Sequence, residues 1–167
     1  MENKIGIFYG STRGKTEYIT SILKDRLAEK CDIYNIVDGV DPIEKYDQLI
    51  LLTPTYGAGQ LQEDWQNSLE SFKKIDFSNK KIAFIGRGNQ GFYAATFVDG
   101  VKILYDIVVE NNGTVGGFVS TEGYIFEKSQ SVVNNKFICL PLDELFLLSE
   151  INEKIDCWLI ELDKFFK

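Results

Sequence analysis

The chain has 167 residues, of which 44% are hydrophobic and 26% are charged. These values are usual for one globular domain with its own core, so we expect a single domain over residues 1–167. The net charge of −7 argues against nucleic acid and against an anionic membrane surface as partners, because both are strongly negative. The same charge can steer a basic protein partner toward the molecule or serve solubility alone.

Cysteine and histidine usage narrows the chemistry further. Histidine is absent, which removes histidine triads, histidine bases and histidine metal ligands. Cys31, Cys139 and Cys157 are far apart and form no Cys-x-x-Cys pair, so we expect no zinc site, iron–sulfur cluster or dithiol. We expect the thiols to be reduced, and the sequence shows no signal peptide and no apolar run of membrane length. We therefore expect a monomeric, cytoplasmic protein without membrane insertion.

The first half of the chain alternates apolar strands with an amphipathic helix. A nearly all-apolar run such as 48–53 is typical of a central parallel strand covered on both faces, and Pro54 is expected to end it. The expected elements are a strand at 4–9, a helix at 14–29 and strands at 31–37 and 48–53.

The second half continues the alternation. We expect helices at 63–74, 92–111 and 152–166, strands at 80–86 and 114–119, a long irregular stretch at 120–135 and a second strand piece at 136–140. Strand–helix alternation with short connections predicts an α/β fold in three layers, with a doubly wound parallel sheet between helices. Ligands of such sheets bind beyond the carboxyl ends of the strands, where the strand order reverses.

The loop after the first strand has the composition of a phosphate cradle. Free N–H groups and the helix dipole favour an anion at a helix N-terminus. Hydroxyl groups add donors, and Gly14 allows close backbone approach. The candidate residues are Ser11, Thr12, Arg13, Gly14, Lys15 and Thr16. Helix capping by Ser11 or Thr12 is the alternative, and the two roles are compatible.

A nucleotide-hydrolase P-loop is excluded by spacing. That motif places four residues between its first glycine and Gly-Lys-Thr, whereas only three residues separate Gly10 from Gly14. The Gly86-x-Gly88-x-x-Gly91 run matches a dinucleotide fingerprint, but it follows the fourth strand instead of the first. We therefore do not assign nicotinamide binding to it.

The loops after the third and fourth strands carry aromatic residues and glycines. They contain Thr55, Tyr56, Gly57, Ala58 and Gly59 in one case, and Arg87, Gly88, Asn89 and Tyr93 in the other. A planar ring between Tyr56 and Tyr93 would gain stacking energy of about 0.5–1.5 kcal/mol per face. Phe92, beside Tyr93, is expected to pack in the core instead.

In this order, the motifs resemble those of flavodoxins, the small FMN-containing electron carriers, and specifically their long-chain class. The resemblance covers essentially the whole chain. It is carried by residues 7–17, by Thr53-Pro54-Thr55-Tyr56 with residues 61–65, by residues 86–94, and by residues 120–124 with Leu142-Asp143-Glu144.

The resemblance implies a five-stranded sheet of order 2-1-3-4-5, an order for which flavodoxin is a standard example. It implies that residues 11–16 hold the FMN phosphate, that Thr55 reaches the ribityl chain, and that Tyr56 and Tyr93 cover the inner and outer ring faces. The peptides of 57–58 and 88–89 would border the ring. Residues 120–136 would be the insertion that splits the fifth strand, with no chemistry assigned.

Several residues depart from the family pattern. Tyr56 stands where tryptophan is frequent, and Arg13 where threonine is usual. Arg87 and Asn89 replace an uncharged residue and an aspartate, so fewer negative charges would face the flavin. Gly57 suits the peptide flip by which flavodoxins stabilise the neutral semiquinone before the hydroquinone forms.

The function implied is single-electron transfer between reductases and oxidases with basic docking surfaces. No residue is an obvious catalytic base or nucleophile, so we expect a carrier and not an enzyme. The alternative is an FMN-dependent NAD(P)H or quinone oxidoreductase on the same fold. A phosphoacceptor receiver domain is discarded, because Gly10-Ser11 and Pro54-Thr55 stand where it needs acidic residues.

Overall fold

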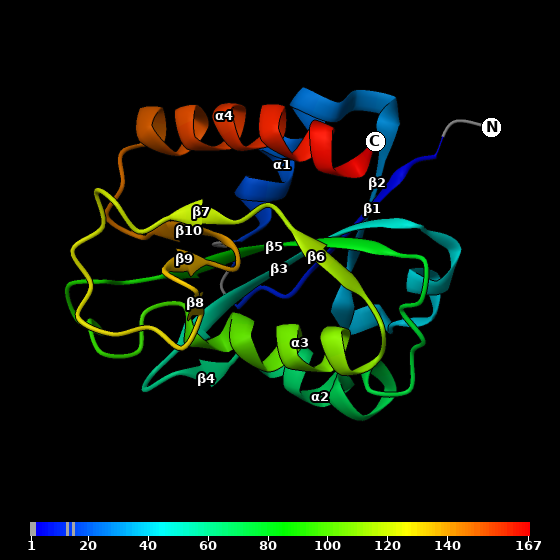
Figure 1. Ribbon diagram of the computed structural model, residues 1–167, viewed down its shortest axis with the longest axis horizontal. Coiled ribbons are helices and arrows are strands. Elements are labelled where there is room, and N and C mark those ends of the chain that lie inside the picture. Colours follow the sequence, from blue (N-terminus) through cyan, green and yellow to red (C-terminus); the bar gives the residue numbers. More distant parts are fainter. Residues whose placement is uncertain (1–2, 13, 15) are drawn as a thin grey trace.

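The computed structural model describes residues 3–12, 14 and 16–167, and a parallel sheet forms its centre (Figure 1). Neighbouring strands follow the order β10-β5-β3-β1-β2, which is the expected 2-1-3-4-5 order of the principal strands. These strands are β1 (Ile5–Tyr9), β2 (Cys31–Asn35), β3 (Gln48–Tyr56), β5 (Lys81–Gly88) and β10 (Leu140–Asp143).

The fifth position of the sheet is divided between two strands, as expected. β6 (Thr114–Gly116) pairs with the start of β5, and β10 pairs with its end. The chain between them, residues 117–139, is called the insertion below. It contains a small antiparallel sheet of β7 (Val119–Ser120), β9 (Lys136–Phe137) and β8 (Val132–Val133). The expected strand at 136–140 is therefore wrong in its bounds, because Lys136 and Phe137 belong to this small sheet.

Two helices cover each face of the central sheet (Figure 1). Alternate residues of β3 point to opposite faces, so Leu49 and Leu51 join one core and Ile50 and Leu52 the other. The first core packs against α2 (Glu63–Phe72) and α3 (Asp99–Glu110), and the second against α1 (Glu17–Leu27) and α4 (Leu148–Phe166). Short helical turns lie at Ala28–Lys30, Ile36–Asp38 and Asp41–Lys45.

Two expected boundaries near the carboxyl ends of the strands are wrong. Pro54 does not end β3, because the strand continues to Tyr56 and there pairs with β4 (Gln60–Leu61). α3 begins at Asp99 and not near residue 92, because residues 91–98 form turns instead of a regular helix. The first difference lengthens a regular strand, and the second lengthens the loop after β5.

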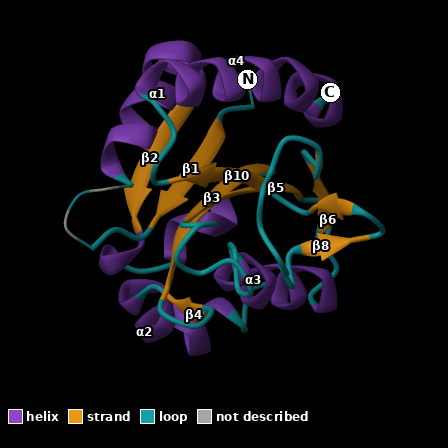
Figure 2. Cartoon of the chain, turned by 90° about the vertical axis from the view of Figure 1, so that its left-hand side faces the viewer, coloured by secondary structure: helices purple, strands orange, loops and turns teal. Residues whose placement is uncertain are grey.

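The carboxyl ends of the central strands lie at the left of Figure 1, and Figure 2 looks onto that end. The loops after β1, β3 and β5 open there together, as the sequence predicts for a parallel sheet. Among the helices that the structure describes, none is long and apolar enough to cross a bilayer.

Candidate functional site

The loop after β1 is closed at its far end by Thr16. This side chain is only 1% exposed, and its hydroxyl donates to the Gly10 carbonyl at 3.0 Å. The Thr16 N–H donates to Ser11 Oγ at 3.3 Å, so Ser11 contributes to the start of α1 in the way a cap does. Gly14 has a φ of +71°, in the left-handed region that favours glycine. Arg13 and Lys15 lie outside the described residues.

Gln62, to which the sequence interpretation gave no role, fixes this loop to α2. Its Oε1 accepts from the Trp65 N–H at 3.1 Å, and its Nε2 donates to Thr12 Oγ1 at 3.3 Å. A Cβ at Gly10 would overlap the Gln62 amide and lie 2.7 Å from Trp65 Cδ1. The close approach of α2 therefore requires glycine at position 10. In the sequence, the role of Gln62 is indicated only by its position directly before a helix that begins with acidic residues.

A cavity of about 830 Å³ opens between the loops at this end of the sheet. Its volume lies in the range of roughly 300–1,000 Å³ that is usual for small-molecule sites. Four predicted residues line it, namely Thr12, Tyr56, Gly59 and Arg87. The further lining residues are Pro54, Gln60, Leu61, Glu63, Gln66, Ile103 and Glu144, to none of which the sequence interpretation gave a role in the site.

The loop after β3 is the three-residue tip of the hairpin between β3 and β4. Gly57 and Gly59 adopt φ values of +52° and +88°. Tyr56 precedes the tip, and its hydroxyl reaches the Thr12 carbonyl at 3.5 Å, which brings the first two loops together. Thr55 is largely buried, and its Oγ1 accepts from the Gly100 N–H at 2.9 Å, which leaves its own proton for a ligand.

The loop after β5 is held by the side chain of Asn89. Its Oδ1 accepts from the N–H groups of Gly91 and Phe92 at 3.0 and 2.8 Å. The Tyr93 N–H donates to the Asn89 carbonyl at 2.9 Å, and the Tyr93 side chain is 48% exposed. Phe92 is 84% exposed, so the expectation that it packs in the core is wrong. The turn closed by Asn89 directs it outward.

Arg87 brings a positive charge to the cavity wall. The residue is only 9% exposed, and its guanidinium carbon lies 5.4 Å from the centre of the Tyr18 ring. This distance is suitable for a cation–π contact. Glu144 lines the same cavity from the end of β10. The two residues place opposite charges on the wall that a bound cofactor would face.

Asp143 joins two segments behind this wall, and the sequence interpretation gave it no role. It is 2% exposed, and its carboxylate accepts from the N–H groups of Gln90 and Leu145 at 3.2 and 2.8 Å. The Glu144 N–H donates to the Gly88 carbonyl at 2.8 Å. These bonds fix the loop after β5 to the segment after β10. The chain positions involved are about 50 residues apart, so no local pattern predicts them.

Comparison with known proteins gives one family. The family model described as flavodoxin matches residues 7–124. Flavodoxin from Nostoc sp. is 34% identical over 97% of this chain and 96% of its own, and flavodoxin 1 from Azotobacter vinelandii is 34% identical over 98% of both. The crystal structure of Fusobacterium nucleatum flavodoxin bound to flavin mononucleotide has a TM-score of 0.94, with 38% identity over 98% of this chain and 99% of that chain.

The fold and the cavity beyond the strand ends are those of a cofactor-binding α/β protein. The chain belongs to the flavodoxin family. It is thus an electron-transfer protein and not an enzyme, which confirms the family and the carrier function expected from the motifs.

Proposed function

We propose that FMN is held at the carboxyl ends of β1, β3 and β5 by the residues expected from the sequence. Ser11, Thr12, Gly14 and Thr16 would take the phosphate, with Arg13 and Lys15 from the same loop. Thr55 would bind the ribityl chain. Tyr56 and Tyr93 would cover the two ring faces. The ring edge would meet Gly57, Ala58, Gly59, Arg87, Gly88 and Asn89.

The observation that supports this proposal best is the cavity that Thr12, Tyr56 and Arg87 line together. These residues come from the loop after β1 and from the ends of β3 and β5, and each carries the chemistry that one part of FMN requires. A hydroxyl suits the phosphate, an aromatic side chain suits the ring, and a guanidinium suits negative charge. Bound FMN supplies one-electron redox chemistry, while the chain orients it and limits the access of water.

We also propose that the chain belongs to the long-chain class of flavodoxins. The insertion supports this, because it separates β6 and β10, which pair with the same strand. As an electron carrier the protein acts on redox partners, and its charge of −7 favours partners with basic docking surfaces. We further propose a monomeric, cytoplasmic carrier, since like-charged copies repel each other and the three cysteines are free thiols.

The experiment that tests this function is a visible spectrum of the purified protein, followed by stepwise reduction with dithionite. We expect a yellow protein that releases FMN on denaturation and takes up two electrons in two resolved one-electron steps. Reduction in a single two-electron step, with steady-state NADPH oxidation by the pure protein, would favour the oxidoreductase alternative. Failure to bind added FMN would overturn the proposed site.

The contribution of the phosphate loop is tested separately with Thr12→Val and a matched surface change, Thr121→Val. Thr12 lines the cavity, whereas Thr121 lies in the insertion. We expect weaker FMN binding only for Thr12→Val, measured by the quenching of flavin fluorescence. Equal affinities would show that the Thr12 hydroxyl does not contact the cofactor.

A further inference from the structure

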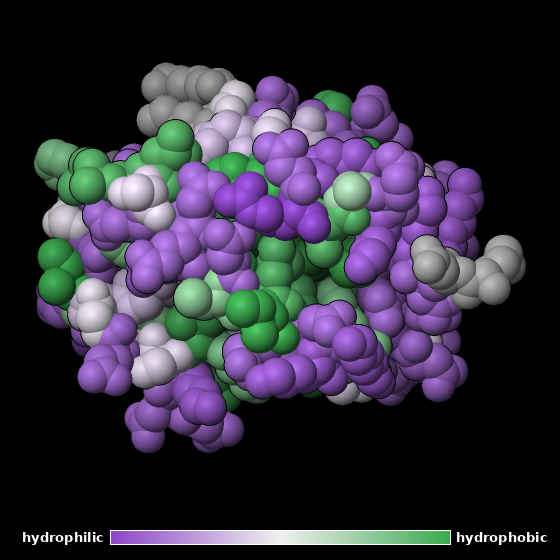
Figure 3. Space-filling model, turned by 90° about the horizontal axis from the view of Figure 1, so that it is seen from above, coloured by the Kyte–Doolittle hydropathy of each residue, from purple (hydrophilic) through white to green (hydrophobic). Residues whose placement is uncertain are grey.

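A second cavity lies at the end of the sheet opposite to the cofactor cavity. Its volume is about 310 Å³, and it opens between the amino ends of β1 and β3 and the final turns of α1 and α4. We call it the amino-end pocket. Its apolar lining residues are Ile5, Leu27, Leu159, Leu162 and Phe166. Figure 3 looks onto the face that α1 and α4 cover and shows hydrophobic side chains between hydrophilic ones.

The apolar lining of the amino-end pocket is the edge of the second core. Leu162 and Phe166 belong to that core, and Ile5, Leu27 and Leu159 are half-buried side chains that pack against it. A ligand with an alkyl chain would cover these three half-buried side chains and contact packed core beneath them. Such burial is favourable because it removes apolar surface from water.

The charged residues of the amino-end pocket are mostly positive. Lys4, Lys30 and Lys167 line it, and Asp163 is the one acidic residue among its described lining residues. The lining therefore carries three positive charges and one negative charge, whereas the whole chain has a net charge of −7. The cofactor cavity differs, because one arginine and two glutamates line it. A positive mouth on an acidic protein favours an anionic ligand at this end of the molecule.

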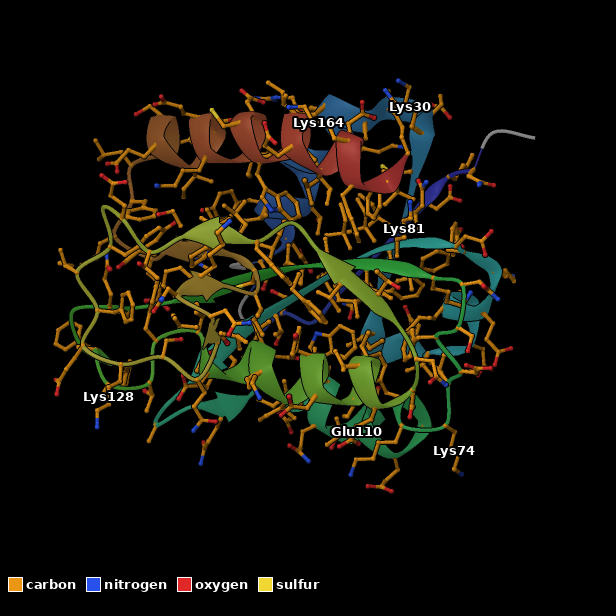
Figure 4. All side chains as sticks on the ribbon, in the orientation of Figure 1. Lys30, Lys74, Lys81, Glu110, Lys128 and Lys164 are labelled. Atoms are coloured by element: carbon orange, nitrogen blue, oxygen red, sulfur yellow. The ribbon has the colours of Figure 1, made fainter. Side chains whose placement is uncertain are left out.

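Lys30 is the lysine of this group that is exposed without an acidic partner. Lys4 Nζ lies 3.3 Å from an Asp32 oxygen, and Lys167 Nζ lies 2.6 Å from an Asp163 oxygen. Among residues 3–12, 14 and 16–167, no carboxylate forms an ion pair with Lys30. Figure 4 places Lys30 beside the end of α4, across the pocket from the start of β1. A negatively charged ligand group at the mouth would give Lys30 a partner.

Complementing a helix dipole does not account for Lys30. Cations are favourable at helix C-termini, and both α1 and α4 end at this pocket. The Ala28 carbonyl that follows α1 already accepts from Lys24 Nζ at 2.9 Å, and the Phe166 carbonyl at the end of α4 accepts from Gln48 Nε2 at 2.8 Å. Because these helix ends have their own donors, the Lys30 ammonium group can serve a ligand.

We propose that the amino-end pocket binds an alkyl carboxylate of medium chain length, with its chain on the apolar lining and its carboxylate at Lys30 and Lys4. The positive lining favours an anion over a neutral or cationic amphiphile. The apolar lining favours an alkyl chain over a bare inorganic anion. A volume of about 310 Å³ is near the lower limit of small-molecule sites, which favours one chain over a lipid with two. This inference goes beyond the proposed function, because the cofactor cavity lies at the other end of the sheet.

The test is a titration of the protein followed by its backbone amide NMR signals, with excess FMN present to compete for the cofactor cavity. The probes are octanoate, 1-octanol and octylammonium, which share one chain and differ in charge. We expect octanoate to shift the signals of the pocket residues saturably. It should bind about threefold more tightly than octanol and about tenfold more tightly than octylammonium. Hexanoate should bind roughly fifteenfold more weakly than octanoate, because each methylene contributes about fourfold.

The charge is tested with Lys30→Gln and the matched control Lys74→Gln. Both lysines are exposed, so neither change should disturb folding, and Lys74 lies on the other side of the sheet (Figure 4). Octanoate should bind about threefold more weakly to Lys30→Gln and with unchanged affinity to Lys74→Gln. The affinity for octanol should be the same in both variants and in the wild type.

The apolar lining is tested with Leu159→Ser and the matched control Ile160→Ser. Ile160 is the next residue of α4, is 63% exposed and does not line the pocket. Octanoate and octanol should both bind about tenfold more weakly to Leu159→Ser, whereas Ile160→Ser should match the wild type.

Equal affinities for octanoate and octanol, or equal affinities of Lys30→Gln and Lys74→Gln for octanoate, would overturn the proposed carboxylate site. Shifts confined to the cofactor cavity, or no saturable shift below the concentration at which octanoate forms micelles, would also overturn it, while the carrier function would stand. Failure of the protein to bind FMN would overturn the proposed function alone, because the amide signals of the two ends of the sheet are read separately.

Discussion

The two loops that flank the proposed ring site are held in different ways. The hairpin tip at 57–59 adopts its shape through positive φ values at Gly57 and Gly59, and a Cβ at Gly57 would meet only the Gln60 side chain. The loop at 89–93 is fixed by the Asn89 side chain and by Gln90, whose N–H donates to Asp143 and whose Oε1 accepts from the Ile125 N–H. The first loop depends on backbone freedom, whereas the second depends on buried polar contacts.

This difference separates two tasks at one cofactor. A peptide that must turn when the flavin gains an electron needs a residue with low barriers between backbone regions, and glycine meets that need. A wall that must keep its shape during the same event needs several bonds to separate parts of the chain. We therefore expect substitutions in the first loop to alter redox behaviour, and substitutions in the second to alter stability or local charge.

Gly57→Pro should have the largest effect on redox behaviour. Proline fixes φ near −65°, which is incompatible with the observed +52° and with a turn of this peptide. Loss of one hydrogen bond to the semiquinone, worth about 1–2 kcal/mol, would lower the first one-electron potential by roughly 40–90 mV and narrow the separation of the two potentials by at least that amount. Spectroelectrochemical titration measures this separation.

The matched control is Gly123→Pro, at another glycine with positive φ and open surroundings. It should leave both potentials unchanged, although it strains the backbone in a similar way. A separation that stays the same in Gly57→Pro would refute the peptide turn.

Asn89→Ala should destabilise the second loop. Two N–H groups lose their side-chain acceptor, and comparable losses at helix caps cost about 0.5–2 kcal/mol. Urea unfolding measures this cost, and we also expect FMN binding to weaken because the loop borders the proposed ring site. Asp76→Ala removes a similar contact to the Ser78 N–H, in the loop that precedes β5. It should lower stability without changing FMN affinity, and a parallel loss of affinity would contradict the local effect.

Asn89→Asp should make the second reduction potential more negative by some tens of millivolts. The carboxylate can accept from the same two N–H groups, so the loop keeps its shape while a negative charge enters the site. Without screening, a unit charge at about 7 Å and an effective dielectric of 20 gives roughly 2.4 kcal/mol, or ~100 mV, and salt reduces this. Asn79→Asp, exposed in the loop before β5, controls for net charge. An unchanged or raised potential in Asn89→Asp would disprove the electrostatic effect.

Local patterns predicted the parallel sheet, the helix faces and the three loops at the cavity, whereas the strand order came from the family resemblance. They succeeded because strand–helix alternation and runs such as 48–53 reflect burial that each segment carries by itself. They failed where distant segments decide the structure. The start of α3 is one example, since the turns before it are bonded to the insertion through the Ala94 carbonyl and the Phe97 N–H.

The site shows the same limit. Thr12, Tyr56, Gly59 and Arg87 were predicted because they stand in the segments expected to form loops after strands, and they line the cavity. Gln62 and Asp143 were missed, because their partners, Thr12 and Gln90, lie about 50 residues away in sequence. A glutamine before a helix or an aspartate at a strand end has no recognisable pattern until the topology supplies its partner.

Asp99 connects the hairpin tip to the insertion, and its pH dependence gives the smallest predicted effect. It is 5% exposed, lies against Gly59 and accepts from the Gln130 N–H of the insertion at 2.7 Å. Burial raises the pKa of Asp99, partly offset by its bonds to Gln130 and Ser129. The folded protein therefore holds this proton more tightly than the unfolded chain, and Asp99 ionisation lowers stability as pH rises above the ordinary carboxyl range.

The variant Asp99→Asn isolates this ionisation, because its amide keeps an oxygen acceptor for Gln130 but carries no titratable proton. The stability of Asp99→Asn relative to the wild type should therefore increase as pH rises from about 4, the ordinary carboxyl pKa, and then level off above the raised pKa of Asp99. Urea unfolding between pH 4 and 8 measures this difference, with exposed Asp106→Asn on the same helix as the control for lost charge. A difference that falls with pH would show that ionised Asp99 is stabilised in the fold, and the hairpin tip would then rest on a buried charge.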